Sequence, residues 1–192
     1  MGFLIAAAQS ASSEDLRHAL RGVRLIGSIR KSGPWWWSVA FYLHFKELHE
    51  ALNSSEVCSL SAYAGDGAWK LSLYGLNQPD FALWFDPALT TERGIEKAKA
   101  QYEGKTSKLA QQFGLSTEDR KLFQDLTFEE AVSRLLELQT EAILNAFQRF
   151  SVPHDPVAIR QTLLNPTADE LESELGNLPR FLEEIGIKGL MG

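Results

Sequence analysis

The stretch TFEEAVSRLLELQTEAILNAFQRF, residues 127–150, predicts one long amphipathic helix. Thr127 and Glu130 have the spacing of a capping box, in which each side chain satisfies a free amide of the first helical turn. Apolar residues recur at helical spacing on one side: Phe128, Val132, Leu135, Leu136, Ile143, Ala146, Phe147 and Phe150. Such a helix is ~35 Å long, enough to cross a small domain, and Pro153 limits it at the carboxyl end.

Residues 57–86 predict an antiparallel meander of three strands. Apolar and polar residues alternate on both sides of Gly65-Asp66-Gly67, which supplies the positive-φ positions of a tight hairpin. Residues 81–85, Phe-Ala-Leu-Trp-Phe, are apolar on both faces, so we expect elements to cover this strand on both sides. Residues 3–8 predict a further short strand near the amino end.

Residues 35–52 fit two structures. On a helix, Trp37, Phe41 and Phe45 share one face with Leu48 and Leu52, whereas in a strand the aromatic residues alternate between two faces. The length of the stretch favours a helix, and its aromatic bias favours a strand for the first half. We therefore predict a helix over residues 35–52, on the basis of the length of the stretch.

After residue 91 the pattern is helical, with segments near 92–103, 105–113 and 117–125 before the long helix and three short segments after it. The predicted fold class is therefore α+β, with a small antiparallel sheet packed on a mostly helical carboxyl-terminal half built around residues 127–150. The absence of repeats and linkers predicts a single domain over residues 1–192, strand-rich in 1–90 and helical in 91–192.

The composition narrows the classes of function. The chain has 192 residues, 44% of them hydrophobic, and a net charge of −6, which disfavours nucleic acid and an anionic membrane as partners. The single cysteine, Cys58, cannot form an internal disulfide, and no apolar run is long enough to span a bilayer. These features favour a cytoplasmic protein, and we expect no bound metal and no cofactor.

One set of residues suggests an enzyme. Pro79-Asp80 followed by Glu103-Gly104-Lys105 resembles the signature of the PD-(D/E)xK nucleases. The resemblance implies a divalent metal held by Asp80 and Glu103, with Lys105 supporting the water nucleophile. In that family the second acid and the lysine lie on an adjacent strand, whereas Glu103 and Lys105 lie in a charge-rich, helix-like stretch.

Trp35, Trp36 and Trp37 are the candidate binding residues. Three consecutive side chains cannot share one buried face of a helix or a strand, so the second apolar face must meet either the rest of the chain or a partner. Because tryptophan anchors interfaces well, we expect Trp35 or Trp36 to remain exposed for another protein or a second copy of this chain.

Three functions are consistent with the sequence. The first is a non-enzymatic protein-binding module, such as an adaptor, inhibitor or immunity-type partner, that uses the tryptophan surface and has no catalytic residue. The alternatives are a metal-dependent nuclease acting through Asp80, Glu103 and Lys105, and a small-ligand binder with an aromatic pocket. The sequence leaves open the partner, the pathway, the oligomeric state and whether the carboxyl-terminal tail docks on its own chain.

Overall fold

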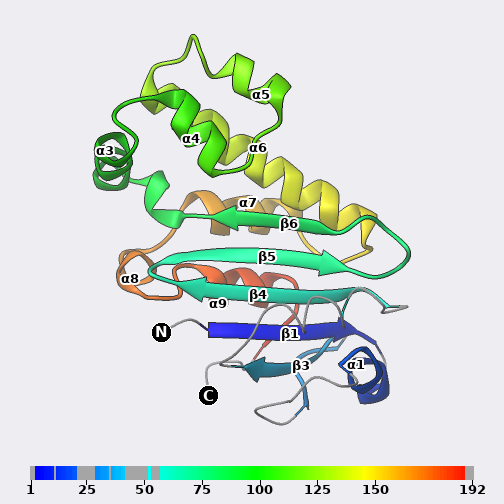
Figure 1. Ribbon diagram of the computed structural model, residues 1–192. Coiled ribbons are helices and arrows are strands. Elements are labelled where there is room, and N and C mark those ends of the chain that lie inside the picture. Colours follow the sequence, from blue (N-terminus) through cyan, green and yellow to red (C-terminus); the bar gives the residue numbers. More distant parts are fainter. Residues whose placement is uncertain are drawn as a thin grey trace.

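The computed structural model contains an antiparallel sheet packed against helices (Figure 1). It describes residues 3–10, 12–20, 29–34, 36–41, 52 and 57–188. In the described part of the chain, six strands pair in the order β2-β3-β1-β4-β5-β6. They are β1 (Phe3–Gln9), β2 (Arg30–Lys31), β3 (Trp36–Phe41), β4 (Ser59–Gly65), β5 (Ala68–Tyr74) and β6 (Phe81–Phe85). The fold is α+β, as the sequence predicts.

The described helices lie mostly in the second half of the chain. They are α1 (Ser13–Ala19), the short 3-10 helix η1 (Pro87–Thr90), α3 (Glu92–Gln101), α4 (Thr106–Gln112), α5 (Thr117–Leu122), α6 (Phe128–Arg149), α7 (Pro156–Leu164), α8 (Ala168–Glu172) and α9 (Leu178–Glu184). The long helix α6 confirms the prediction for residues 127–150. Thr127 and Glu130 form both hydrogen bonds of its capping box.

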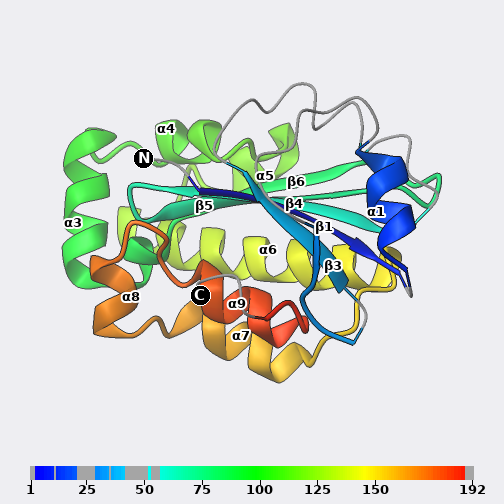
Figure 2. The same cartoon turned by 90° about the horizontal axis from the view of Figure 1, so that it is seen from below.

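The two faces of the sheet have different cover. The first face packs against α6, α7 and α9, which lie together on one side of the strands in Figure 2. Leu60, Leu71 and Phe85 point into this core, where α6 contributes Leu135 and Phe147. The second face carries a smaller cluster near α1, and α4 and α5 lie on the same side next to β6.

The meander forms as the sequence predicts. Asp66 and Gly67 have φ angles of 56° and 81°, the left-handed values of a two-residue hairpin turn, and Gly65 pairs with Ala68 at its base. This register sends every second residue of β4 and β5 to the first face.

The helix expected over residues 35–52 is wrong at its start. Residues 36–41 form β3, which pairs with both β1 and β2. Aromatic and β-branched residues fit a pleated strand better than a helix, and the pairing supplies the backbone hydrogen bonds that β1 needs on that side. Residues 42–51 lie outside the described part of the chain, and Leu52 is helical and buried.

The last described residues dock on the amino-terminal half. The Lys188 amide donates a hydrogen bond of 2.5 Å to the Ser32 carbonyl, and Ile187 is buried in the main core. Gly33 lies so close to Gly186 that a Cβ atom on Gly33 would stand 1.8 Å from the Gly186 oxygen. This contact requires glycine at position 33 and joins the segment before β3 to the end of α9.

Candidate functional site

Trp36 is not part of an exposed surface. Its side chain is fully buried in the main core, and its indole Nε1 donates a hydrogen bond of 2.7 Å to the Ile185 carbonyl. Trp37 points to the second face, is partly buried, and packs near the Leu16 and Leu20 cluster. Trp35 lies outside the described residues. Trp36 is therefore not the exposed residue of this pair, and the expectation that Trp35 or Trp36 is exposed stays a prediction for Trp35.

The residues that resemble the nuclease signature are not brought together. Asp80 directly precedes β6, whereas Glu103 follows α3, which lies near the other end of that strand (Figure 1). A five-residue strand is about 17 Å long, which is too far for two ligands of one metal ion. Glu103 instead binds Lys105 at 2.8 Å and Lys108 at 2.5 Å, and these two lysines hold the pKa of its carboxyl below the ordinary value.

The remaining candidates for chemistry among the described residues are metal ligands and Cys58. In the described ranges, no three His, Cys, Asp or Glu side chains are close enough to hold a metal ion. Cys58 is buried, and this burial raises the pKa of its thiol to about 12, so it remains protonated and unreactive at neutral pH. None of the described helices is both long and apolar enough to cross a membrane.

The most prominent exposed aromatic residue of the described chain is Trp84, on the edge strand β6. Its side chain is 44% exposed on the second face, so the prediction that both faces of residues 81–85 are covered is wrong. Trp84 stands in a row across three strands with Lys70 and Tyr63, and its ring meets Tyr63 edge-on with 6.1 Å between centroids. The first face of β6 packs against α6.

A first concavity, called the edge cleft, runs along the free side of β6. It has a volume of about 630 Å³ and lies between β6, the turn joining α4 to α5, and α6. Phe113 and Leu115 line it from the turn, and Leu138 and Ala142 line it from α6. Gln139 of α6 donates a hydrogen bond of 2.7 Å from Nε2 to the Trp84 carbonyl, while its own Oε1 is buried without a partner.

A second concavity, called the hairpin cleft, lies on the other side of Trp84. It has a volume of about 530 Å³ and lies between the β4–β5 hairpin and the ends of α3 and α4. Its lining is aromatic and acidic: Tyr63, Trp84, Phe85, Tyr102, Phe113, Asp66 and Asp86. Both clefts share Trp84, Gln112 and Phe113, so they flank one aromatic ridge.

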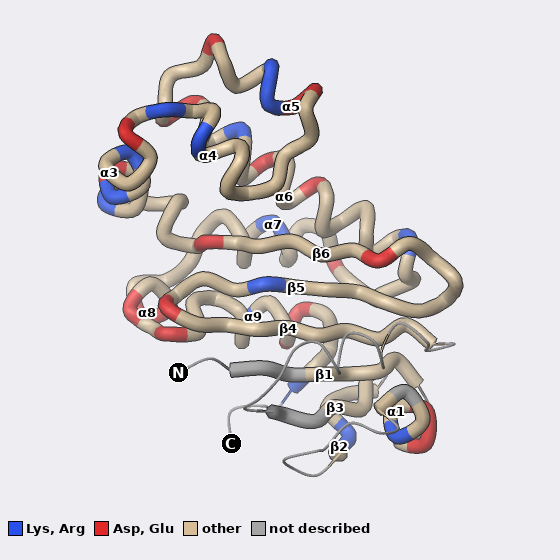
Figure 3. Tube along the Cα trace, in the orientation of Figure 1, with Lys and Arg blue, Asp and Glu red and all other residues tan. Residues whose placement is uncertain are grey.

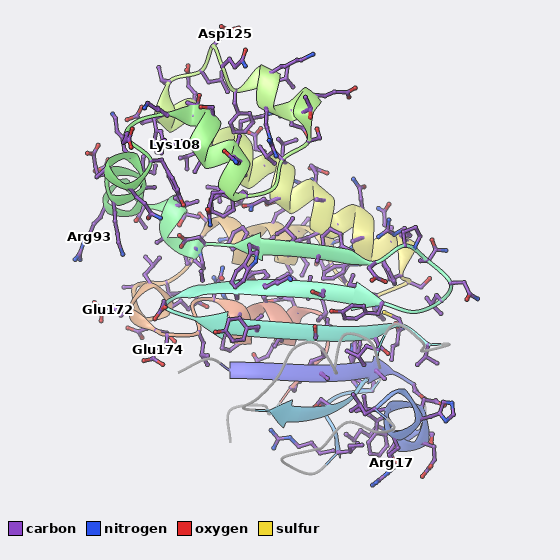
Figure 4. The ribbon with its side chains drawn as sticks, in the orientation of Figure 1. Arg17, Arg93, Lys108, Asp125, Glu172 and Glu174 are labelled. Atoms are coloured by element: carbon purple, nitrogen blue, oxygen red, sulfur yellow. The ribbon has the colours of Figure 1, made fainter. Side chains whose placement is uncertain are left out.

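The charges around the ridge are mainly negative. Asp66 and Asp86 line the hairpin cleft, Asp119 and Glu141 line the edge cleft, and Lys70 is the only basic residue on the three strands β4, β5 and β6 (Figure 3). Arg93 of α3 and Asp125 of the loop before α6 lie at the outer margin of the molecule in Figure 4, and neither lines a cleft.

Two groups of the hairpin cleft have raised pKa values. Burial raises the pKa of the Asp86 carboxyl, against the opposing effects of its hydrogen bond from the Ala88 amide and of Lys97. Burial also raises the pKa of the Tyr102 hydroxyl, and the nearby Asp86 adds to this effect. The cleft is therefore partly desolvated, which disfavours the ionised forms of both groups.

No relative identifies this chain. No protein-family model matches it, and neither the comparison with curated proteins nor the comparison with solved structures found a significant match. Its function is therefore inferred from its own residues.

The sequence contained two signals of this site. The strand of residues 81–85 is the last of the meander and is followed only by helices, which is the position of an edge strand. Gln139 is a polar residue on the buried side of α6, where it reaches the backbone of that edge.

Proposed function

We propose that this protein is a non-enzymatic protein-binding module that holds its partner against Trp84 and the two clefts beside it. The observation that carries the proposal is the exposure of a large aromatic side chain, 44%, between concavities of about 630 and 530 Å³. Tryptophan residues flanked by pockets are typical anchors of protein interfaces. The proposed binding surface is thus centred on Trp84, whereas the sequence analysis names Trp35, Trp36 and Trp37 as the candidate binding residues.

The charge around Trp84 indicates the kind of partner. Four carboxylates and one lysine line the two clefts, with Glu141 in an ion pair with Arg160 of α7, and the whole chain has a net charge of −6. A basic partner would be attracted to this surface before contact, which speeds association and makes it sensitive to salt. An adaptor, an inhibitor or an immunity-type protein all fit this description.

A phage library of random short peptides tests the proposal. Peptides selected on the wild-type protein should be basic and should bind the Trp84→Ala variant about 30-fold more weakly, the loss typical of an interface anchor. Val157→Ala is the matched control, because Val157 is an apolar residue of α7 with 74% exposure that lines neither cleft. Selected peptides that bind wild type and Trp84→Ala equally well would overturn the proposal.

A second candidate is a small-ligand binder, favoured by the lining of the hairpin cleft. Aromatic rings around the half-buried Asp86 carboxylate suit an organic ammonium ion, and about 530 Å³ is the size of a ligand pocket. Choline and spermidine are suitable probes in a calorimetric titration. Binding that is lost in Asp86→Asn would support this candidate, and no heat with either compound at millimolar concentration would reject it.

A further inference from the structure

The outer edge of β6 has backbone groups that none of the other described strands uses. Gly65 and Ala68 close the two-residue hairpin as a hydrogen-bonded pair, so Lys70, two residues further, also bonds to β4. The backbone groups of Lys70 are then directed away from β6. Its neighbour Trp84 accordingly directs its own N–H and C=O toward the free edge.

Along a strand of an antiparallel sheet, the backbone N–H and C=O groups of successive residues point alternately to the two neighbouring sides. Ala82, two residues before Trp84, therefore has the same orientation as Trp84. Its N–H and C=O also point to the free edge, whereas Phe81, Leu83 and Phe85 bond to β5. The hydrogen bond from Gln139 to the Trp84 carbonyl agrees with this assignment. Among the described residues, three groups of this edge therefore remain for a partner: both backbone groups of Ala82 and the N–H of Trp84.

We propose that the edge cleft receives an extended, basic segment of the partner protein, which pairs with β6 as an additional strand. The inference rests on the proposed function and specifies how the partner binds. In strand addition, main-chain hydrogen bonds supply affinity and the alternating side chains supply specificity. The edge cleft provides both, since it runs along the open edge and is walled by α6 and by the α4–α5 turn.

The size of the cleft sets the length of the segment. Strands lie ~4.8 Å apart, sheets pack ~10 Å apart and residues rise ~3.3 Å, so one residue of an added strand needs ~160 Å³. A cleft of about 630 Å³ accordingly holds a segment of about four residues.

The lining sets the pattern of side chains. A partner residue opposite Ala82 or Trp84 has its side chain on the second face, beside the Trp84 ring and the Asp119 carboxylate. Arginine or lysine fits there through its charge and its attraction to the ring. The residue between them faces Leu138 and Ala142 of α6, which favours a small apolar side chain.

A second copy of this chain fits the edge less well. Two β6 strands paired edge to edge would bring together the carboxylates of both edge clefts, which repel each other. The walls formed by α6 and the α4–α5 turn also suit a single extended chain rather than the edge of another sheet.

The substitution Ala82→Pro tests the hydrogen bonds on the protein side. It removes the outward N–H of Ala82 without removing a bond to β5, and proline is tolerated on an edge strand in this orientation. Selected peptides should bind Ala82→Pro at least about tenfold more weakly, while the control Ala82→Ser, which keeps the N–H, should change affinity by less than about twofold.

N-methylated peptides test the same bonds on the wild-type protein, so the result does not depend on how well a variant folds. Methylation should weaken binding by about tenfold or more at every second residue and have little effect at the residues between. Peptides that need Trp84 but ignore both Ala82→Pro and N-methylation would overturn strand addition and leave the proposed function standing.

Two further outcomes would also be decisive. A selection that yields no peptide dependent on Trp84 would overturn strand addition together with the proposed function. Sedimentation that shows a dimer of the wild-type chain, dissociated by Ala82→Pro but not by Ala82→Ser, would identify a second copy as the occupant and overturn the assignment of a basic partner segment.

Discussion

Replacing Trp36 by alanine should destabilise the fold strongly, because this side chain is 0% exposed and hydrogen-bonded to the Ile185 carbonyl. Loss of a buried tryptophan ring costs ~3–5 kcal/mol. For a domain of this size, each kcal/mol lowers the melting temperature by ~2–4 °C, so Trp36→Ala should melt ~6–20 °C below wild type.

The substitution Trp36→Phe separates packing from hydrogen bonding. It keeps an aromatic ring but leaves the Ile185 carbonyl without its donor, at a cost of ~1–3 kcal/mol. Trp84→Ala is the matched control: because Trp84 is 44% exposed, we expect a loss of about 1 kcal/mol or less. Urea denaturation followed by circular dichroism measures all three variants. A free energy of unfolding for Trp36→Ala within about 1 kcal/mol of wild type would refute the burial argument.

Three other perturbations test different parts of the structure. Asn177→Leu should lower the free energy of unfolding, measured by urea denaturation, by ~2–5 kcal/mol. The reason is that fully buried Asn177 accepts a hydrogen bond from Trp69 Nε1 at 2.8 Å and donates one to the Thr162 carbonyl at 2.6 Å. A loss below about 1 kcal/mol would contradict this role. Because folding raises the pKa of Asp86, the folded state loses stability as the pH rises above the ordinary pKa of 3.8. Asp86→Asn should therefore have a higher melting temperature than wild type at neutral pH and the same melting temperature below pH 3.8. A lower melting temperature of Asp86→Asn at neutral pH would show that the carboxylate is stabilised by folding. Cys58 should react with a thiol reagent only after denaturant is added, since it is 3% exposed and has a pKa of about 12; rapid reaction of the native protein would contradict its burial.

The parts of the fold that follow from local patterns could be predicted from the sequence. The capping box and apolar stripe of α6 are local features, as are Asp66 and Gly67 in the hairpin turn. Each depends on residues within a few positions of one another, so the chemistry of a short segment is sufficient to specify it.

Long-range contacts explain what could not be predicted. Residues 36–41 form a strand because β1 and β2 pair with them, and the hydrogen-bond acceptor of Trp36 lies 149 residues away. The same holds for the candidate site. Trp84 is exposed because of where β6 stands in the strand order, and the clefts beside it form only when α4, α5 and α6 come near that edge.

The contact between Trp36 and Ile185 also has a consequence for how the chain is made. During synthesis, β3 emerges long before its partner carbonyl exists, so the indole N–H of Trp36 must stay solvated until Ile185 has left the ribosome. The indole N–H of Trp69 likewise cannot form its hydrogen bond until Asn177, 108 residues later, has been synthesised. Closing such distant pairs late slows folding, and it leaves the nascent sheet open to other chains in the interval.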